Sequence, residues 1–320
     1  MNTVVTIVDG QASATVPGPL HDGDTASFVV PKVNPWDVVY PGTLTSTALT
    51  AFIKAHPGQK IGIGPATLNA TLELRQVSGT LVLMGDIRTT VDASPGAFHF
   101  VGCTLTLDLD DWRITGPIKL ADFAGKANNF EQHHGIRDDG GHVTIQHGTV
   151  SGFWGDCISY RAWDPKNGGD GKAPLATMLD LALTLGGRCG WSFIQAASGS
   201  SATLVNTDQT GAWGADLETN SGPDIIGAVV ITGGTIGSHG LGKNPTWTSD
   251  GIISAIQISC NKSSKPAGPV TIQNVDGDQL DIIAKHVSIL TLDTLTSKNP
   301  ARLFTENVGK VVKSGLVNIT

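Results

Sequence analysis

The sequence is poor in charge. Only 15% of its 320 residues are Asp, Glu, Lys or Arg, against roughly 25% in ordinary soluble domains. The 28 acidic residues outnumber the 21 basic ones, which gives a net charge of −7, and Lys and Arg form no cluster. Such a chain does not attract polyanions, so we expect binding neither to nucleic acid nor to an anionic membrane.

Long apolar runs and targeting signals are also missing. No run approaches the ~18 apolar residues of a membrane span. Residues 1–6 lack the basic start and apolar block of a secretory signal peptide. We therefore expect a protein that does not cross a membrane through a span of its own, and that leaves the cell, if it does, by a non-classical route.

Several motifs with known chemistry are absent. The four cysteines, at positions 103, 157, 189 and 260, contain no C-x-x-C pair, which excludes zinc-ribbon and thioredoxin sites. We expect buried thiols, because cysteine packs well as a small apolar residue. The sequence also contains no P-loop, nucleophile elbow or dinucleotide fingerprint.

What the sequence does contain is a short pattern that recurs from His134 onward, in which a polar or small pair precedes one apolar residue. The spacing runs from 22 residues (Ile136 to Ile158) to 35 (Leu217 to Ile252). Repeats of this length built from strands indicate a solenoid or a propeller. Propeller blades need about four strands in ~40–45 residues, so short strands in units of variable length favour a parallel β-helix. The apolar positions are 136, 158, 191, 217, 252 and 280.

Upstream of the repeats, the sequence predicts two further regions. Residues 1–43 are rich in Thr, Val, Gly and Pro and read as a few short strands in an irregular lead-in, which either covers the coil or attaches it to a larger assembly. Residues 45–56 predict a helix with Leu49, Phe52 and Ile53 on one face, a cap at Thr45 or Ser46, and an end at Pro57. A helix there would seal the open end of a solenoid. We therefore divide the chain into residues 1–43 and a β-helix domain over 44–320.

These features carry a resemblance. The predicted helix, followed by PGQKIGIGPATL and GTLVLMG, resembles the opening of right-handed parallel β-helix proteins of the pectate-lyase-like superfamily. HVTIQHGTVSGFWGDCISYR and SATLVNTDQTGAWGADLETN resemble the coil repeats of that superfamily. The resemblance covers roughly residues 44–300. It implies an all-β fold, namely a single-stranded right-handed parallel β-helix (solenoid) with an N-terminal capping helix.

The resemblance indicates architecture better than chemistry, because the same coil serves lyases, hydrolases, epimerases and phage tailspikes. The missing signal peptide and the separate N-terminal segment look more like a phage tail or tailspike component. That reading implies a virion or extracellular location, a homotrimer as one assembly the resemblance allows, and a polysaccharide or cell-surface glycan as partner.

Alternation along the strands predicts which side chains face outward. If the recurring apolar residues point inward, their immediate neighbours point out. Strands stack about 4.8 Å apart, so residues from successive repeats should line one stripe. Its predicted members are Arg137, Ser159, Ser192 and Glu218, with Cys157, Asp216, Ile253 and Asp281 also facing outward.

Asp216 and Glu218 are the predicted catalytic pair. Carboxylates at i and i+2 on a strand share a face about 6.6 Å apart, and glycosidases use two carboxylates roughly 5–9.5 Å apart. The alternative is a solvated acidic face. Arg137 could assist by orienting a uronate or sulfate, although Arg137 to Gly141 also reads as a tight turn. Family signatures of polygalacturonases are absent.

The predicted substrate contacts are Asp138, Asp156, Ser159, Tyr160, Trp163 and Trp247, because aromatic faces beside polar groups suit sugar rings. We predict no metal site, since His142 and His147 lie five residues apart and would face opposite sides of a strand. No cofactor is expected. Ca²⁺, which lyases of the family hold with acidic clusters, is the one ion the resemblance allows.

Two functions remain open from the sequence. The first is a polysaccharide hydrolase or lyase of tailspike type, with Asp216 and Glu218 central. The second is a non-catalytic glycan-binding or structural phage tail protein. A groove holding both carboxylates would favour the first, and a flat exposed stripe the second.

Overall fold

The structure is a computed structural model that describes residues 4–8, 11–15, 34–123, 133–162, 174–186, 189–194, 200–210, 217–221, 226–237, 255–260 and 268–319. Its contacts separate the chain into two units, Met1–Asn34 and Pro35–Thr320. The second unit includes β3 (Val38–Val39), which pairs with β4 (Lys60–Ile63). In the smaller unit, β1 (Val4–Val8) and β2 (Gln11–Thr15) form an antiparallel pair, with Val4 opposite Thr15.

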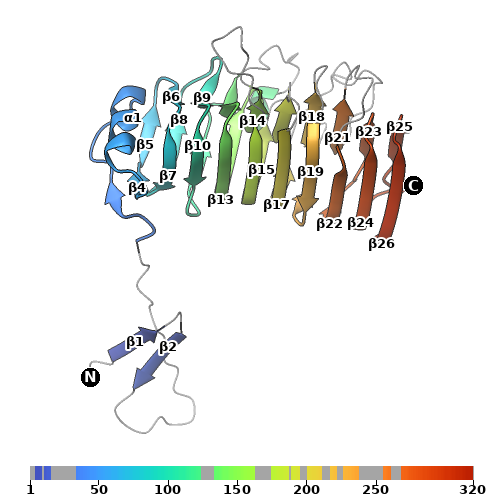
Figure 1. Ribbon diagram of the computed structural model, residues 1–320, viewed down its shortest axis with the longest axis horizontal. Coiled ribbons are helices and arrows are strands. Elements are labelled where there is room, and N and C mark those ends of the chain that lie inside the picture. The colour runs from blue at the N-terminus through green and yellow to red at the C-terminus, as the bar shows by residue number, and fades with distance from the viewer. Residues whose placement is uncertain are drawn as a thin grey trace. The chain divides into compact units, whose positions relative to one another are not determined.

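The larger unit consists mostly of β-strands in parallel sheets, as the sequence predicted (Figure 1). Successive strands of each sheet come from successive repeats of the chain, and the chain passes alternately between the sheets. This arrangement is compatible with a β-helix. Among the described residues, one sheet has nine strands: β6 (Leu72–Arg75), β9 (Gly96–Val101), β12 (His134–Asp139), β14 (Ile158–Arg161), β16 (Trp191–Ile194), β18 (Leu217–Ser221), β21 (Ile256–Cys260), β23 (Ile282–Lys285) and β25 (Leu303–Glu306).

The other sheet contains fifteen strands within the described part of the chain. Its main path continues from β3 and β4 through β7 (Ser78–Leu83), β10 (Thr104–Asp108), β13 (His142–Phe153), β15 (Leu175–Gly186), β17 (Ser200–Thr210), β19 (Ile226–Thr232), β22 (Val270–Gly277), β24 (Ile289–Ser297) and β26 (Lys310–Val317). Four short strands pair beside this path: β5 (Ala66–Leu68), β8 (Ile87–Thr89), β11 (Arg113–Thr115) and β20 (Thr235–Ile236). A 3₁₀ turn, η1, spans Leu120–Phe123.

Stacked apolar columns form the core between the sheets. In the nine-stranded sheet, Ile136 pairs with Ile158, Ile158 with Trp191, and Trp191 with Leu217. The first three of these side chains are fully buried. The predicted register of this column is thus confirmed over four repeats.

The prediction fails in the two repeats that follow. The column continues through Ile256 and Ile282, not through Ile252, which lies outside the described residues, or Leu280. Leu280 and Asp281 both precede β23, which begins at Ile282. Both side chains are buried, although we predicted that Asp281 would face outward.

One helix, α1 (Ser46–Ala55), lies at the end of the row of strands in Figure 1. The Thr45 hydroxyl accepts a hydrogen bond from the backbone N–H of Ala48 and caps the helix, as the sequence predicted. Leu49 and Ile53 are buried in the same core cluster as the strands. No helix of the described chain is long and apolar enough to cross a membrane. Cys103, Cys157 and Cys189 are buried as thiols.

The long strands of the fifteen-stranded sheet bend at a stacked corner residue with positive φ. Asn206 is such a residue, and it lies between Val205 and Thr207, which pair with Leu179 and Leu181 on the preceding strand. A left-handed conformation is unfavourable for residues other than Gly, Asn and Asp, and five of the seven corner positions hold one of these three residues. The corner residues are His147, Asp180, Asn206, Gly233, Asn274, Thr294 and Gly315.

Before this corner, the outward face of the same sheet carries a column of threonines. Each member pairs with the next in register from β7 to β24, with one valine in the series. All are half-buried, because each side chain packs between its neighbours above and below. This threonine column consists of Thr80, Thr106, Thr144, Thr177, Thr203, Val230, Thr271 and Thr291.

Candidate functional site

The outward face of the nine-stranded sheet carries the polar residues. Arg137 pairs with Ser159, Ser159 with Ser192, and Ser192 with Glu218, so the predicted stripe exists as a register column. Towards the helix-capped end the same column continues through His99 and Glu73. Arg137 and Glu218 are three strands apart, about 14 Å at 4.8 Å per strand.

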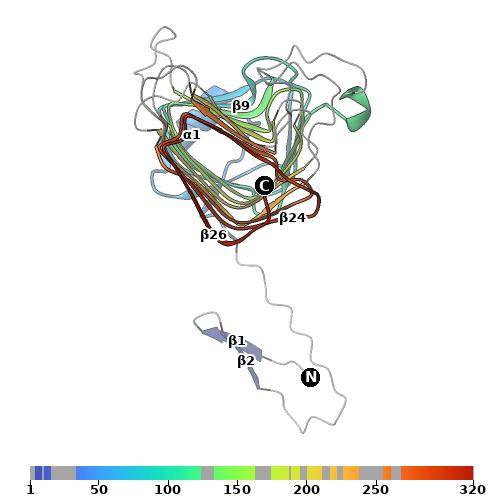
Figure 2. The ribbon, with the colours of Figure 1, turned by 90° about the vertical axis from the view of Figure 1, so that its right-hand side faces the viewer.

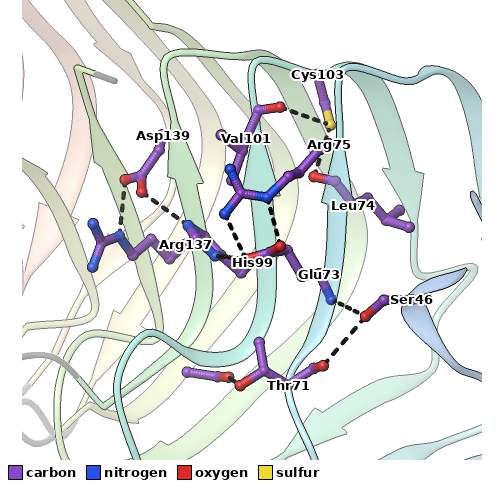
Figure 3. A network of polar contacts seen from close by, with 11 residues as sticks. Ser46, Thr71, Glu73, Leu74, Arg75, His99, Val101, Cys103, Arg137 and Asp139 are labelled. Carbon is purple, nitrogen blue, oxygen red and sulfur yellow. Dashed lines mark hydrogen bonds and ion pairs between the residues drawn. The ribbon is translucent and has the colours of Figure 1, made fainter. Parts of the chain in front are cut away.

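A charged network, which we call the His99 network, occupies this face over β6, β9 and β12 (Figure 3). The His99 ring lies between two carboxylates, with Nδ1 2.9 Å from Glu73 Oε2 and Nε2 2.8 Å from Asp139 Oδ2. Each carboxylate also accepts from an arginine, since Arg75 Nε lies 2.6 Å from Glu73 Oε1 and Arg137 Nε 2.8 Å from Asp139 Oδ1. Five side chains from three strands thus form one chain of charge-assisted contacts.

Both carboxylates of the His99 network are held in the ionised form. The hydrogen bond from Arg75 lowers the pKa of Glu73, and the contact with His99 lowers it further. Burial works to raise the pKa of Asp139, but hydrogen bonds from His99 and Arg137 prevail and hold it below its usual value. Ionised carboxylates only accept hydrogen bonds, so the imidazolium form of His99, which donates from both nitrogens, satisfies both contacts.

The network is graded in exposure. The Arg75 side chain is 52% exposed and that of Glu73 34%, whereas those of His99 and Asp139 are nearly buried. The Ser46 hydroxyl, at the start of α1, accepts from the backbone N–H of Glu73 at 2.8 Å and ties the helix to this strand. The His99 network is therefore nearly buried at His99 and Asp139 and exposed to solvent at Arg75.

A second network, the Asp156 network, lies beside the first and is completely buried. The Ser192 hydroxyl contacts Asp156 Oδ2 and lies 3.0 Å from the Ser159 hydroxyl. Arg161 reaches Ser159 through Nε at 3.4 Å and the ring of His134 through Nη2 at 2.8 Å. His134 Nδ1 lies 3.3 Å from Asp156 Oδ2, which completes a ring of five side chains.

Chemistry fixes the direction of most hydrogen bonds in this ring. A guanidinium only donates, so His134 Nε2 accepts from Arg161. His134 Nδ1 lies 3.1 Å from the backbone nitrogen of Asp156, whose N–H is directed at it, and 3.3 Å from Asp156 Oδ2. A carboxylate only accepts, so Ser192 donates to Asp156 and Ser159 donates to Ser192. Within this ring neither serine contacts the histidine, so the ring does not have the arrangement of a nucleophile–base pair.

Two predicted substrate contacts face the interior. Asp138 is 1% exposed and Tyr160 fully buried, and Asp138 pairs in register with Phe100 on one neighbouring strand and with Tyr160 on the other. Burial, followed by the charge of Asp139, raises the pKa of Asp138 well above its usual range. Burial also raises the pKa of Tyr160. Neither side chain lies where a polymer could reach it, so we remove both from the substrate contacts.

The other predicted site residues fall into three groups by their place in the structure. Asp156 and Ser159 are members of the buried Asp156 network and are not surface contacts. Glu218 lies in β18, where the backbone pairing is defined. Asp216, Trp163 and Trp247 lie outside the described residues.

Five members of the two networks were not among the predicted site residues: Glu73, His99 and Asp139 in one network, and His134 and Arg161 in the other. The alternation rule applied to Leu72-Glu73-Leu74 and Phe98-His99-Phe100 would have placed Glu73 and His99 outward. His134, where the recurring sequence pattern starts, is the first residue of β12. Within the described chain, no group of three or more His, Cys, Asp and Glu residues could hold a metal ion.

Comparison with known proteins leaves the site to be interpreted from its own geometry. No protein-family model, no curated protein and no solved structure matches this chain.

Proposed function

We propose that the larger unit is a single-stranded right-handed parallel β-helix of the pectate-lyase-like or tailspike kind, and that the outward face of its nine-stranded sheet binds a polysaccharide. The alternation of the chain between two parallel sheets supports the first part of this proposal. The His99 network is the observation that carries the second part.

The His99 network has the chemistry of a sugar-binding surface. Ionised carboxylates accept hydrogen bonds from sugar hydroxyls, and guanidinium groups donate to ring and hydroxyl oxygens. The groups of Glu73, His99 and Asp139 are held in place by one another, so little side-chain freedom is lost when a ligand binds. Arg75, at the exposed end, supplies the first contact.

The position of the network suits a polymer. The column that contains Glu73, His99 and Arg137 runs across three successive strands, at right angles to them. A polymer lying along this direction would meet these three strands one after another, whereas the next members of the column, Ser159 and Ser192, are buried. A cell-surface glycan is the polymer that a phage tail component would meet, and we infer a virion or extracellular location on that basis.

The electrostatics favour binding over acid catalysis at this network. Glycoside cleavage needs a carboxylic acid whose pKa is raised, so that it holds a proton to donate. Glu73 and Asp139 both have lowered pKa values. The His99 network is therefore a recognition element and not a proton donor.

The test is binding of purified bacterial surface polysaccharides to the full chain, measured by glycan array and calorimetry. We expect Arg75→Gln to weaken binding of the recognised polysaccharide by tenfold or more at an unchanged melting temperature, and Arg137→Gln to weaken binding similarly with some loss of stability, because Arg137 pairs with the nearly buried Asp139. Arg113→Gln, an exposed arginine on β11 of the other sheet, is the matched control and should bind as wild type. Wild-type protein that binds no polysaccharide, or arginine variants that bind normally, would contradict the proposal.

A second candidate function is cleavage of the bound polysaccharide, as hydrolase or lyase, by Asp216 and Glu218. The observation that favours it is the register of Glu218, which pairs with Ser192 on one neighbouring strand and with Gln257 on the other. Loss of general acid–base help typically lowers the rate 10²–10⁴-fold. Glu218→Gln should then abolish turnover and keep binding, whereas turnover that survives this substitution would exclude the site.

A further inference from the structure

The last described repeat of the larger unit leaves two strand edges open. β25 and β26 are the end strands of the two sheets, so within the described part of the chain no strand pairs with their outer edges. They lie at the opposite end from α1 in Figure 1, and Figure 2 looks onto that end with β26 in front. An open edge presents a row of N–H and C=O groups to which another strand can pair, and proteins therefore protect such edges.

The two ends of the stack are covered differently. At the first end, Leu49 and Ile53 of α1 are buried in the core cluster. At the last end, Val311 of β26 is 40% exposed, although Leu290, its partner in register on β24, is fully buried. The apolar core therefore reaches solvent at the edge of β26, where a further strand would cover it.

One inward position of β26 holds a lysine. In the nine strands from β4 to β24, the residues in register with this position are all apolar and at most 4% exposed. Lys313 pairs with the last of them, Leu292. A further strand would bury the Lys313 ammonium, and burying a charge costs free energy unless it is paired. The apolar column consists of Ile61, Leu81, Leu107, Ile145, Met178, Leu204, Ile231, Ile272 and Leu292.

The Lys313 side chain is held at this end. Its Nζ donates to the carbonyl oxygen of Ile319 at 3.1 Å, and Ile319 forms a backbone bridge with Ala301. The chain turns between Lys313 and Ile319 at Gly315, whose φ is +61°. The lysine thus connects β26 to the segment that follows the turn, and its stem can cover apolar surface while its charge stays near water.

A bulge in β26 acts in the same direction. Asp293 pairs with Ser314 and Leu295 with Val317, so two residues of β26 lie where β24 has one. A bulge bends the strand and leaves the extra residue unpaired. Inward-pointing charges and bulges on an edge strand are two of the means by which proteins prevent unwanted strand pairing, and β26 carries both.

We propose that Lys313 closes this end of the stack to the addition of another strand. A strand that paired with β26 would lie over Lys313 as Lys313 lies over Leu292, and it would take the ammonium out of water. The penalty for an ion buried in this way corresponds to ~100-fold or more in an equilibrium constant. The helix α1 and Lys313 then protect the two ends of one stack by different means.

The experiment compares two lysines of the same strand in the full chain. Lys313→Leu continues the apolar column, whereas Lys310→Leu adds the same apolar group at a position that pairs with the exposed Ile289. Because α1 covers the other end, we expect Lys313→Leu molecules to pair through β26 and to stop at twice the mass of the wild-type species. Their self-association should be ~100-fold tighter or more, with slower amide hydrogen exchange in residues 310–317. Lys310→Leu should keep the mass and the exchange of wild type.

Sedimentation velocity and hydrogen-exchange mass spectrometry make these measurements up to about 100 μM, a range in which unpaired strand edges associate. Three results would overturn the proposal. The first is Lys313→Leu protein with the mass and exchange of wild type, since the charge would then not close the edge. The second is Lys310→Leu protein that associates as tightly as Lys313→Leu, because added apolar surface would then be sufficient. The third is wild-type protein in which β26 exchanges as slowly as β24, which would show that its edge is already paired. If Lys313→Leu melts earlier than wild type, Lys313→Met, which keeps a long unbranched side chain, carries the same test.

Discussion

The two sheets use the same geometry for opposite chemistry. Each repeat places one outward residue in a column on either sheet, so Glu73, His99 and Arg137 stand in register on one side and Thr80 and Thr106 on the other. The first column is held by ion pairs and the second by packing of uncharged side chains. The backbone therefore fixes where a column lies, and the residue type decides whether that column is charged or uncharged.

The comparison also explains why polar groups are tolerated on the nine-stranded sheet even where they are buried. Burying a charge costs free energy unless it is paired and hydrogen-bonded. In the Asp156 network each polar side chain makes at least two contacts within the ring. The threonine column needs no such ring, because hydroxyls at half-buried positions reach solvent.

The largest expected difference between the faces is in stability. Asp156→Ala removes the acceptor of Ser192 and the carboxylate that contacts His134, and it takes the buried negative charge out of a ring that also contains the Arg161 guanidinium. Breaking a buried charge network in this way typically costs about 3–5 kcal/mol. Thr203→Ala on the other face should cost less than about 0.5 kcal/mol, as surface substitutions usually do. Urea denaturation of both variants makes this comparison, and an Asp156→Ala variant within about 1 kcal/mol of wild type would show that the ring does not support the fold.

A smaller loss is expected from the His99 network. Asp139→Asn weakens hydrogen bonds to two cationic groups, each worth about 1.5–3 kcal/mol. The folded-state pKa of Asp139 is depressed, so its contribution is present above the unfolded pKa of about 3.9 and is lost as pH falls through the folded value. Wild type should therefore exceed Asp139→Asn in stability at pH 7 and match it near pH 2. A constant difference across this range would contradict the ion-pair assignment.

The contribution of Asp138 to stability depends on pH in the opposite direction. Its folded-state pKa is raised by burial, so no penalty exists at pH values where the carboxyl is protonated in both states. The penalty grows as pH rises above about 3.9 and levels off above the folded pKa, and it amounts to about 1.4 kcal/mol for each pH unit that separates the folded and unfolded pKa values. Asp138→Asn should stabilise the protein at pH 7 relative to its effect at pH 3. Denaturation at both values measures this, and equal effects would place Asp138 in contact with solvent or a cation.

The smallest effect concerns the exposed end of the His99 network. Arg75→Gln breaks an ion pair whose side chains are 52% and 34% exposed, and such pairs contribute about 0–1 kcal/mol. Added salt screens exposed charges, so the difference from wild type should disappear at about 1 M NaCl. A loss above about 2 kcal/mol would show that Arg75 is structural and would weaken the case for its role in binding.

Strand alternation explains which features were predictable from the sequence. It placed Arg137, Ser159, Ser192 and Glu218 in one column correctly, because one buried residue per repeat fixes the parity of its neighbours. The same rule places Asp138 inward, two residues after the buried Ile136. The chemical character of an aspartate beside an arginine led us to place it at the surface instead, and parity proved to be the stronger guide.

The networks themselves could not be read from the sequence. Arg161 and His134 are separated by 27 residues, and Ser192 and Asp156 by 36. Their contact depends on how many residues each connection between strands contains, which no local pattern specifies. The later repeats show the same limit, because the strand expected near Leu280 begins at Ile282.

The central claim is that the charged column of the nine-stranded sheet recognises a polysaccharide. The measurement that tests it most directly is the affinity of two arginine variants, one on each sheet, for the polysaccharide that wild type recognises. We predict that Arg75→Gln loses affinity by tenfold or more at the melting temperature of wild type, whereas Arg113→Gln, on the other sheet, keeps it. Equal affinity of the two variants would contradict the claim.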